Sequence, residues 1–140
     1  MNEKLCFTIE GEELYLDKVL VDYHDIPIFF ICIGARGYYV VLCTNMEELS
    51  YIIVKPSLSE LNNMLHGKIT MREIFAKQLQ YWEVRTGNTV SSDAVLLKNI
   101  CEANLSDYPD KGARFEILTS EEEEYVKRID EQISNNDMEL

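Results

Sequence analysis

The residues of this chain best suited to proton-transfer chemistry are its two histidines. His24 is followed by Asp25, and a carboxylate next to an imidazole can orient the ring for general acid or base catalysis. Neighbouring residues of a strand point to opposite faces, however, and an Asp before Ile26-Pro27 is typical of a turn. His66, before Gly67, is typical of the last turn of a helix. We therefore expect no catalytic residue at either histidine and, because the two are far apart in sequence, no metal site.

The four cysteines, a residue type that binds metals and exchanges disulfides, are widely scattered. Cys6, Cys32, Cys43 and Cys101 show none of the short spacings of zinc sites or redox pairs. Cys32 and Cys43 lie on consecutive expected strands, and a symmetric turn between them would place Cys32 opposite Tyr39. We expect reduced thiols and no bound metal or cofactor.

The segment Gly34-Ala35-Arg36-Gly37 contains the residue types of a phosphate-binding loop. Such loops connect a strand to a helix and have a longer glycine pattern, whereas this segment connects two expected strands. We interpret it as a hairpin turn. The chain contains no nucleophile elbow, zinc-protease helix or nucleotide-binding fingerprint, which favours a binding protein over an enzyme.

Aromatic and charged side chains are the stronger candidates for binding. Tyrosine and tryptophan are favoured at contacts with partners and ligands, although strands also favour them. Arginines can neutralise a phosphate group, and acidic residues attract a basic partner. The candidate binding residues are Tyr38, Tyr39, Tyr51, Tyr81, Trp82, Arg36, Arg85, Glu121 and Glu124.

Acidic residues outnumber basic residues by 25 to 13, which gives a net charge of −12. This charge repels phosphate backbones, so we expect no direct binding of nucleic acid. From Glu121 to the end there are eight acidic side chains against Lys127 and Arg128. This segment is either a solvated helix face or a mimic of a phosphate backbone that occupies a basic groove.

A sheet formed by the first part of the chain must position the aromatic candidates. Between Leu5 and Val54, short apolar or alternating segments are separated by turn residues. In the segments Ile28–Ile33 and Tyr38–Cys43, both alternating sets of residues are apolar. Both faces of these strands therefore need cover. An antiparallel meander of about five strands, with these two in its centre, is the simplest topology.

Two short helices are predicted after the sheet, because each begins with a capping box. Ser57 and Glu60 form the first box. Thr70 and Glu73 form the second, and we expect that helix to run to about Gln80.

The remaining segments are assigned from apolar period and turn residues, and Ala94–Leu105 fits either a strand or a helix. The other assignments are a strand at Tyr81–Val84, a loop at Arg85–Asp93, a turn at Asp107–Gly112, a strand at Ala113–Leu118 and a helix from Thr119 or Ser120.

The expected fold class is therefore α+β: an antiparallel meander sheet of about five to seven strands packed with two short central helices and a C-terminal helix. We expect a single domain over residues 1–134 and a frayed acidic tail over residues 135–140. No apolar run reaches the roughly 18 residues of a membrane span, and the first residues show no signal-peptide pattern. A cytoplasmic location is expected.

Several segments together resemble a family of small bacterial and phage proteins, a domain of unknown function. They are Tyr38–Cys43, Leu65–Lys68, Ile69–Phe75 and Tyr108–Gly112, within a resemblance that spans about residues 14 to 118. The resemblance implies a bacterial or viral setting and no known reaction.

Three functions follow as hypotheses. The first is a binding protein without catalysis that neutralises a protein partner, for example an immunity protein or a phage inhibitor of host defence. The second is a sponge for a nucleotide signal, in which tyrosines stack on the base and arginines neutralise the phosphate. The third is an enzyme that uses His24 and nearby carboxylates.

Overall fold

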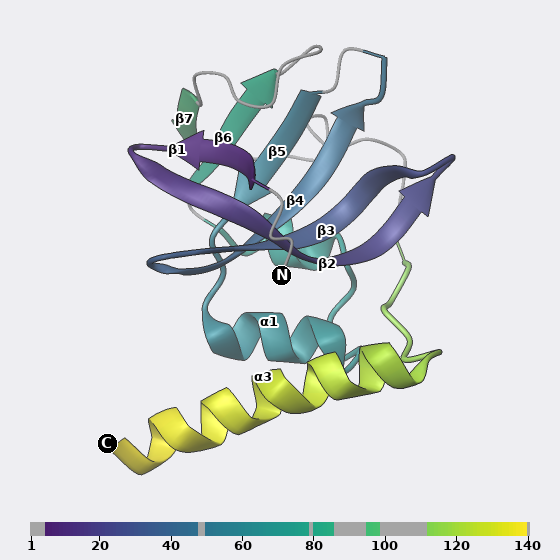
Figure 1. Ribbon diagram of the computed structural model, residues 1–140, viewed down its shortest axis with the longest axis vertical. Coiled ribbons are helices and arrows are strands. Elements are labelled where there is room, and N and C mark those ends of the chain that lie inside the picture. The colour runs from purple at the N-terminus through teal and green to yellow at the C-terminus, as the bar shows by residue number, and fades with distance from the viewer. Residues whose placement is uncertain (1–4, 48–49, 79, 86–94, 99–111, 140) are drawn as a thin grey trace.

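The computed structural model describes residues 5–47, 50–78, 80–85, 95–98 and 112–139. Over these residues the chain forms one antiparallel sheet in which every strand pairs with the next strand along the sequence. The sheet curves into a half-barrel, and the helices lie on one side of it (Figure 1). The strands are β1 (Leu5–Ile9), β2 (Glu12–Tyr23), β3 (Ile26–Gly34), β4 (Gly37–Asn45), β5 (Ser50–Val54), β6 (Gln80–Arg85) and β7 (Val95–Lys98). The predicted meander is therefore confirmed, and Val95–Lys98, within the ambiguous segment, is a strand.

Tight turns connect the first strands. The β2–β3 turn is formed by His24 and Asp25, whose φ angles of 50° and 67° match the left-handed backbone that a two-residue hairpin turn requires. This confirms the turn predicted at His24-Asp25. Cys32 pairs with Tyr39 across β3 and β4, and Gly34 pairs with Gly37, so the hairpin predicted at the glycine-arginine segment is also confirmed.

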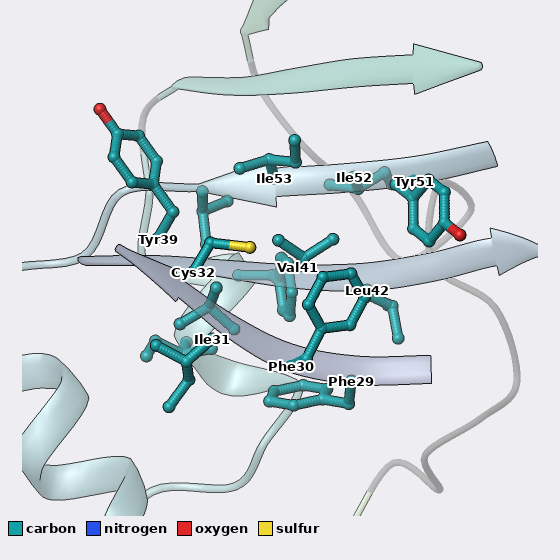
Figure 2. Close-up of a cluster of buried hydrophobic side chains, with 14 of the residues drawn as sticks. Phe29, Phe30, Ile31, Cys32, Tyr39, Val41, Leu42, Tyr51, Ile52 and Ile53 are labelled. Carbon is teal, nitrogen blue, oxygen red and sulfur yellow. The ribbon is translucent and has the colours of Figure 1, made fainter. Parts of the chain in front are cut away.

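The core lies on both faces of the central strands (Figure 2). Phe29 packs edge-on against Phe75 of the helical layer, with ring centroids 5.7 Å apart. The next residue, Phe30, points to the opposite face and packs with Tyr51 and with Phe7 of β1. The double-sided cover predicted for these strands is present.

Two short helices follow the fifth strand, as predicted, but the second is shorter than expected. In α1 (Leu58–Leu65) the Ser57–Glu60 capping box is complete. The second box also forms, because the Glu73 amide donates to Thr70 Oγ1 at 3.0 Å and the Thr70 amide donates to Glu73 Oε1 at 2.9 Å. However, α2 spans only Glu73–Ala76. Gln80, expected to lie in this helix, begins β6, because its pairing with Lys98 of β7 requires extended backbone there.

The strand predicted at Ala113–Leu118 is wrong, because this segment has no regular secondary structure. Its hydrogen bonds go to the connection between α1 and α2: the Met71 amide donates to the Ala113 carbonyl, and Arg114 donates to the Gly67 carbonyl. The segment therefore crosses the ends of the helices instead of extending the sheet.

The last helix, α3 (Ser120–Glu139), runs alongside α1 (Figure 1). Val126 and Ile129 of this helix are buried. The backbone of α3 is helical as far as Glu139. No described helix is long and apolar enough to cross a membrane. Residues 86–94 of the predicted loop and residues 107–111 of the predicted turn lie outside the described part of the chain.

Candidate functional site

Four of the five aromatic candidates lie in the interior. Tyr39 is 2% exposed, Tyr81 5%, Trp82 8% and Tyr51 9%. Figure 2 shows Tyr39 and Tyr51 at opposite ends of the same cluster of buried side chains. Burial raises the pKa of Tyr51 to about 12, so this hydroxyl stays protonated at neutral pH. The expectation that these rings form a binding surface is not supported, because in this conformation they fill the core.

The remaining candidates of the sheet are not brought together. Tyr38 is half-buried, and its hydroxyl oxygen accepts a hydrogen bond from Gln132 of α3 at 2.7 Å. The Arg36 side chain is exposed at the β3–β4 turn. Arg85 ends β6, and its side chain lies outside the described part of the chain.

A buried carboxylate that the sequence did not reveal links two hairpins. Glu12 accepts hydrogen bonds from the Tyr39 hydroxyl at 2.5 Å and from the Arg36 amide at 2.7 Å. Burial, followed by the bond to Glu12, raises the pKa of Tyr39, so the phenol remains a donor. Gly34 leaves room for this contact, since a Cβ there would lie 2.4 Å from Glu12 Oε2. Glu12 therefore has a structural role, and the only signal in sequence was an acid that directly follows Glu10-Gly11.

A histidine and an aspartate meet between α1 and α3. His66, the C-cap of α1, places Nε2 2.8 Å from Asp130 Oδ1, and Asn62 donates to the same oxygen. The bond from His66, with that from Asn62, lowers the pKa of Asp130 despite the cost of burial. The helix-end position of His66 was predicted correctly, but its partner lies 64 residues away and no local pattern indicates the pair. The pair joins two helices, as a structural ion pair does.

Three of the four cysteines lie in the sheet: Cys6 in β1, Cys32 in β3 and Cys43 in β4. Among the described residues, Cys6, Cys32 and Cys43 form no disulfide. A hydrogen bond with Cys6, together with burial, raises the pKa of Cys32, so this thiol is a poor nucleophile. Cys101 lies outside the described residues. The described residues contain no group of three or more His, Cys, Asp or Glu side chains arranged to hold a metal ion.

The acidic candidates lie at the start of α3, next to two exposed apolar residues. Ile117 is 42% exposed and Leu118 is 77% exposed. Glu121, Glu123 and Glu124, in the first two turns, are also exposed. We call these five residues the α3 patch.

The N-terminal cap of α3 leaves Leu118 uncovered. Thr119 caps α3, because the Glu122 amide donates to Thr119 Oγ1 at 3.1 Å and the Thr119 amide donates to Glu122 Oε1 at 3.1 Å. Leu118 precedes this cap, where an apolar residue usually packs against the fourth residue of the helix. That residue is Glu123, which pairs instead with Lys127 at 3.6 Å. Leu118 therefore has no apolar partner at the fourth residue of α3.

Glu121 and Glu124 also border a hollow of about 540 Å³ between α3 and β2. Tyr125 is buried beside it and donates to Asp17 of β2 at 2.6 Å, while Arg128 lies 5.2 Å from the centroid of the Tyr125 ring. The hollow contains both acidic and basic side chains, which suits a polar contact with a protein. No protein family, curated protein or solved structure matches this chain.

Proposed function

We propose that this chain is a non-catalytic protein that binds a basic protein partner through the α3 patch and neutralises it. The observation that carries the proposal is the exposure of Leu118, 77%, beside three exposed acidic residues. An isolated exposed leucine is ordinary. Two consecutive large apolar residues next to a row of acids match an interface, in which an apolar centre is surrounded by charge.

Charge supports the same proposal. The chain carries a net charge of −12, and the first turns of α3 concentrate that charge around Leu118. A field of this sign attracts a basic protein, raises the association rate and makes it depend on salt. The helix N-terminus favours these carboxylates as well, so the patch is stable without a partner.

The acids with shifted pKa values support binding more than catalysis. Hydrogen bonds lower the pKa of Glu73 through Thr70 and, against the effect of burial, the pKa of Glu60 through Ser57. Both carboxylates cap helices, and Asp130 joins two helices. Each shift therefore has a structural cause.

We place this binding in conflict between bacteria and phages, the setting that the sequence resemblance implies. The partner would then be a basic toxin or a basic component of host defence, met in the cytoplasm. The nucleotide sponge gains no support, because three of the four candidate tyrosines, Tyr39, Tyr51 and Tyr81, are buried. An enzyme with an unrecognised site remains the alternative, and His24, at the β2–β3 turn, packs against Tyr23 with ring centroids 4.2 Å apart.

A pull-down with matched variants tests the proposal. The wild type, Ile117→Ser/Leu118→Ser and Glu121→Gln/Glu124→Gln would be incubated with bacterial lysate at low and high salt. We expect one basic protein to be retained by the wild type at low salt and lost from both variants.

The control is Glu13→Gln/Glu47→Gln, which removes two exposed charges from the sheet side of the molecule. It should retain the partner, because it leaves the α3 patch unchanged. It removes the same number of charges as Glu121→Gln/Glu124→Gln, so a difference between these two variants is not an effect of net charge. Equal retention by every variant, or no specific protein under either condition, would reject the α3 patch as the binding surface.

A further inference from the structure

Two cysteine side chains meet on the face of the sheet that β1 covers. Among the described strands β1 pairs with β2 alone, yet its Phe7 ring stacks on Phe30 of β3, with centroids 6.3 Å apart. The same ring packs edge-on against Tyr51 of β5, with centroids 5.1 Å apart. Strand β1 therefore lies across this face. Cys32 follows Phe30 by two residues on β3, so its side chain points to the same face, within the cluster of Figure 2.

A bulge in β1 directs Cys6 toward that face. The register of β1 with β2 shifts between Leu5 and Phe7, so Cys6 is an extra residue on the bulged strand. In a regular strand Cys6 would point away from the face that Phe7 occupies, and bulges commonly redirect a side chain. The Cys6 thiol forms a hydrogen bond with the Cys32 thiol. The two sulfur atoms are therefore direct neighbours, although their strands are not paired.

The two thiols differ in access to solvent. Cys6 is partly exposed, whereas Cys32 is 0% exposed. The hydrogen bond with Cys6, followed by burial, raises the pKa of Cys32, so Cys32 keeps its proton and donates to the Cys6 sulfur. A small reagent from solvent therefore meets Cys6 first, and Cys32 lies behind it as the second thiol. Redox-sensing cysteines often have this arrangement, an accessible thiol beside a resolving thiol.

We propose that Cys6 and Cys32 form a redox pair, which a peroxide converts into a disulfide between β1 and β3. In the first step the Cys6 thiolate attacks one peroxide oxygen and the O–O bond breaks. Cys6 becomes a sulfenic acid, and the hydroxide that leaves takes up the proton that Cys6 released. In the second step the Cys32 sulfur attacks the Cys6 sulfur and the S–O bond breaks, and the leaving hydroxide departs as water with the Cys32 proton. The two thiols are oxidised, and the peroxide is reduced to water.

The disulfide fixes the edge strand β1 over the face of the sheet. A link between Cys6 and Cys32 closes the loop that contains the whole β1–β2 hairpin, which restricts the unfolded chain and stabilises the folded one. We expect the oxidised protein to have a Tm about 5 °C or more above that of the reduced protein. The pair shares no residue with the α3 patch, so this proposal is independent of the proposed function.

Peptide mapping tests the pair on the full chain, because trypsin places each of the four cysteines in a separate peptide. The wild type would be treated with hydrogen peroxide, its remaining thiols blocked, and the protein digested without a reductant. We expect a species that links the Cys6 peptide to the Cys32 peptide and lacks the mass of two hydrogen atoms. Dithiothreitol should separate the two peptides and return the Tm to its reduced value.

Two variants provide the comparison. Cys43→Ala/Cys101→Ser keeps only the proposed pair and should form the same link with the same rise in Tm over its own reduced form. Cys6→Ser should give no linked species and no rise. The proposal is overturned if peroxide leaves the wild-type Cys6 and Cys32 peptides unlinked, links either of them to another cysteine instead, or leaves the Tm unchanged. The wild-type digest decides the outcome by itself if a variant fails to fold.

Discussion

At the scale of single residues, this protein uses its buried polar groups to fix how the hairpins approach each other. Glu12 is the clearest case, because one carboxylate accepts from a side chain of β4 and from the backbone of the β3–β4 turn. A buried acceptor with two donors contributes to stability, whereas removal of its carboxylate would leave both donors unsatisfied. The close approach depends on Gly34, which has no Cβ to displace Glu12.

Replacement of Gly34 by alanine tests this contact. The new Cβ would lie 2.4 Å from Glu12 Oε2 and 2.7 Å from Leu14 Cδ2, so the Glu12 side chain must move. We expect Gly34→Ala to lower the free energy of unfolding by about 1–3 kcal/mol, measured by urea denaturation. Gly112→Ala is the control, since no atom of the described residues lies within 4 Å of a Cβ there. Unchanged stability of Gly34→Ala would mean that the Glu12 contact does not constrain the hairpins.

Some features of single residues could be predicted from the sequence, and others could not. The turn at His24-Asp25 could be predicted, because local backbone preferences decide it. Burial of Tyr39 and Trp82 could not, since strands favour aromatic residues whether they face a core or a partner. The exposed Leu118 was missed for a similar reason: it was assigned to a strand, where it would have been covered.

At the scale of elements, α3 is held against the rest of the molecule by a buried apolar stripe and by polar contacts to three other elements. These contacts join α3 to α1, β2 and β4, and their pairs are Asp130 with His66, Tyr125 with Asp17, and Gln132 with Tyr38. Because the α3 patch lies on this helix, the docking of α3 sets the position of the proposed binding surface.

Asp130 makes this docking sensitive to acid. Its pKa is below the ordinary value of 3.8 in the folded protein, so its contribution to stability is present above that pH and is lost as the pH falls through the lowered pKa. We expect Asp130→Asn to reduce stability at pH 7 by roughly 0.5–1 kcal/mol, because the carboxylate is partly exposed. At about pH 3 the difference from the wild type should be smaller, because the contribution of the ionised Asp130 carboxylate to stability declines once the pH is below 3.8.

Urea denaturation at both pH values measures this difference. Glu131→Gln, an exposed acid on the same helix, provides the comparison and should show little change at either pH. If Asp130→Asn differed from the wild type by the same amount at pH 7 and pH 3, the bond with His66 would not depend on ionised Asp130.

Elements were predicted best where local signals and tertiary contacts agree. Both capping boxes formed where Ser57 and Thr70 indicated. The end of α2 was predicted wrongly, because pairing of Gln80 with Lys98 of β7 overrides the local helical preference of Gln80. The segment Ala113–Leu118 has the apolar pattern of a strand, but its hydrogen bonds go to the helix connection.

At the scale of the whole molecule, the sheet is a well-packed half-barrel, and the helices lie on one side of it (Figure 1). The aromatic residues stabilise the half-barrel, and the net charge of −12 is concentrated in part on the last helix. Such a distribution gives the molecule an acidic face with an exposed leucine, which a basic partner can approach by electrostatic steering. The central claim is that the α3 patch is the surface that this partner contacts.

Site-specific photocrosslinking in bacterial lysate tests that claim most directly. A photoreactive amino acid would replace Leu118 in one sample and Tyr23, which is 52% exposed on the β2–β3 hairpin, in another. The account predicts one crosslinked product with a basic protein from position 118, weakened by high salt, and no such product from position 23. Absence of a specific product at position 118, or the same product from both positions, would contradict it.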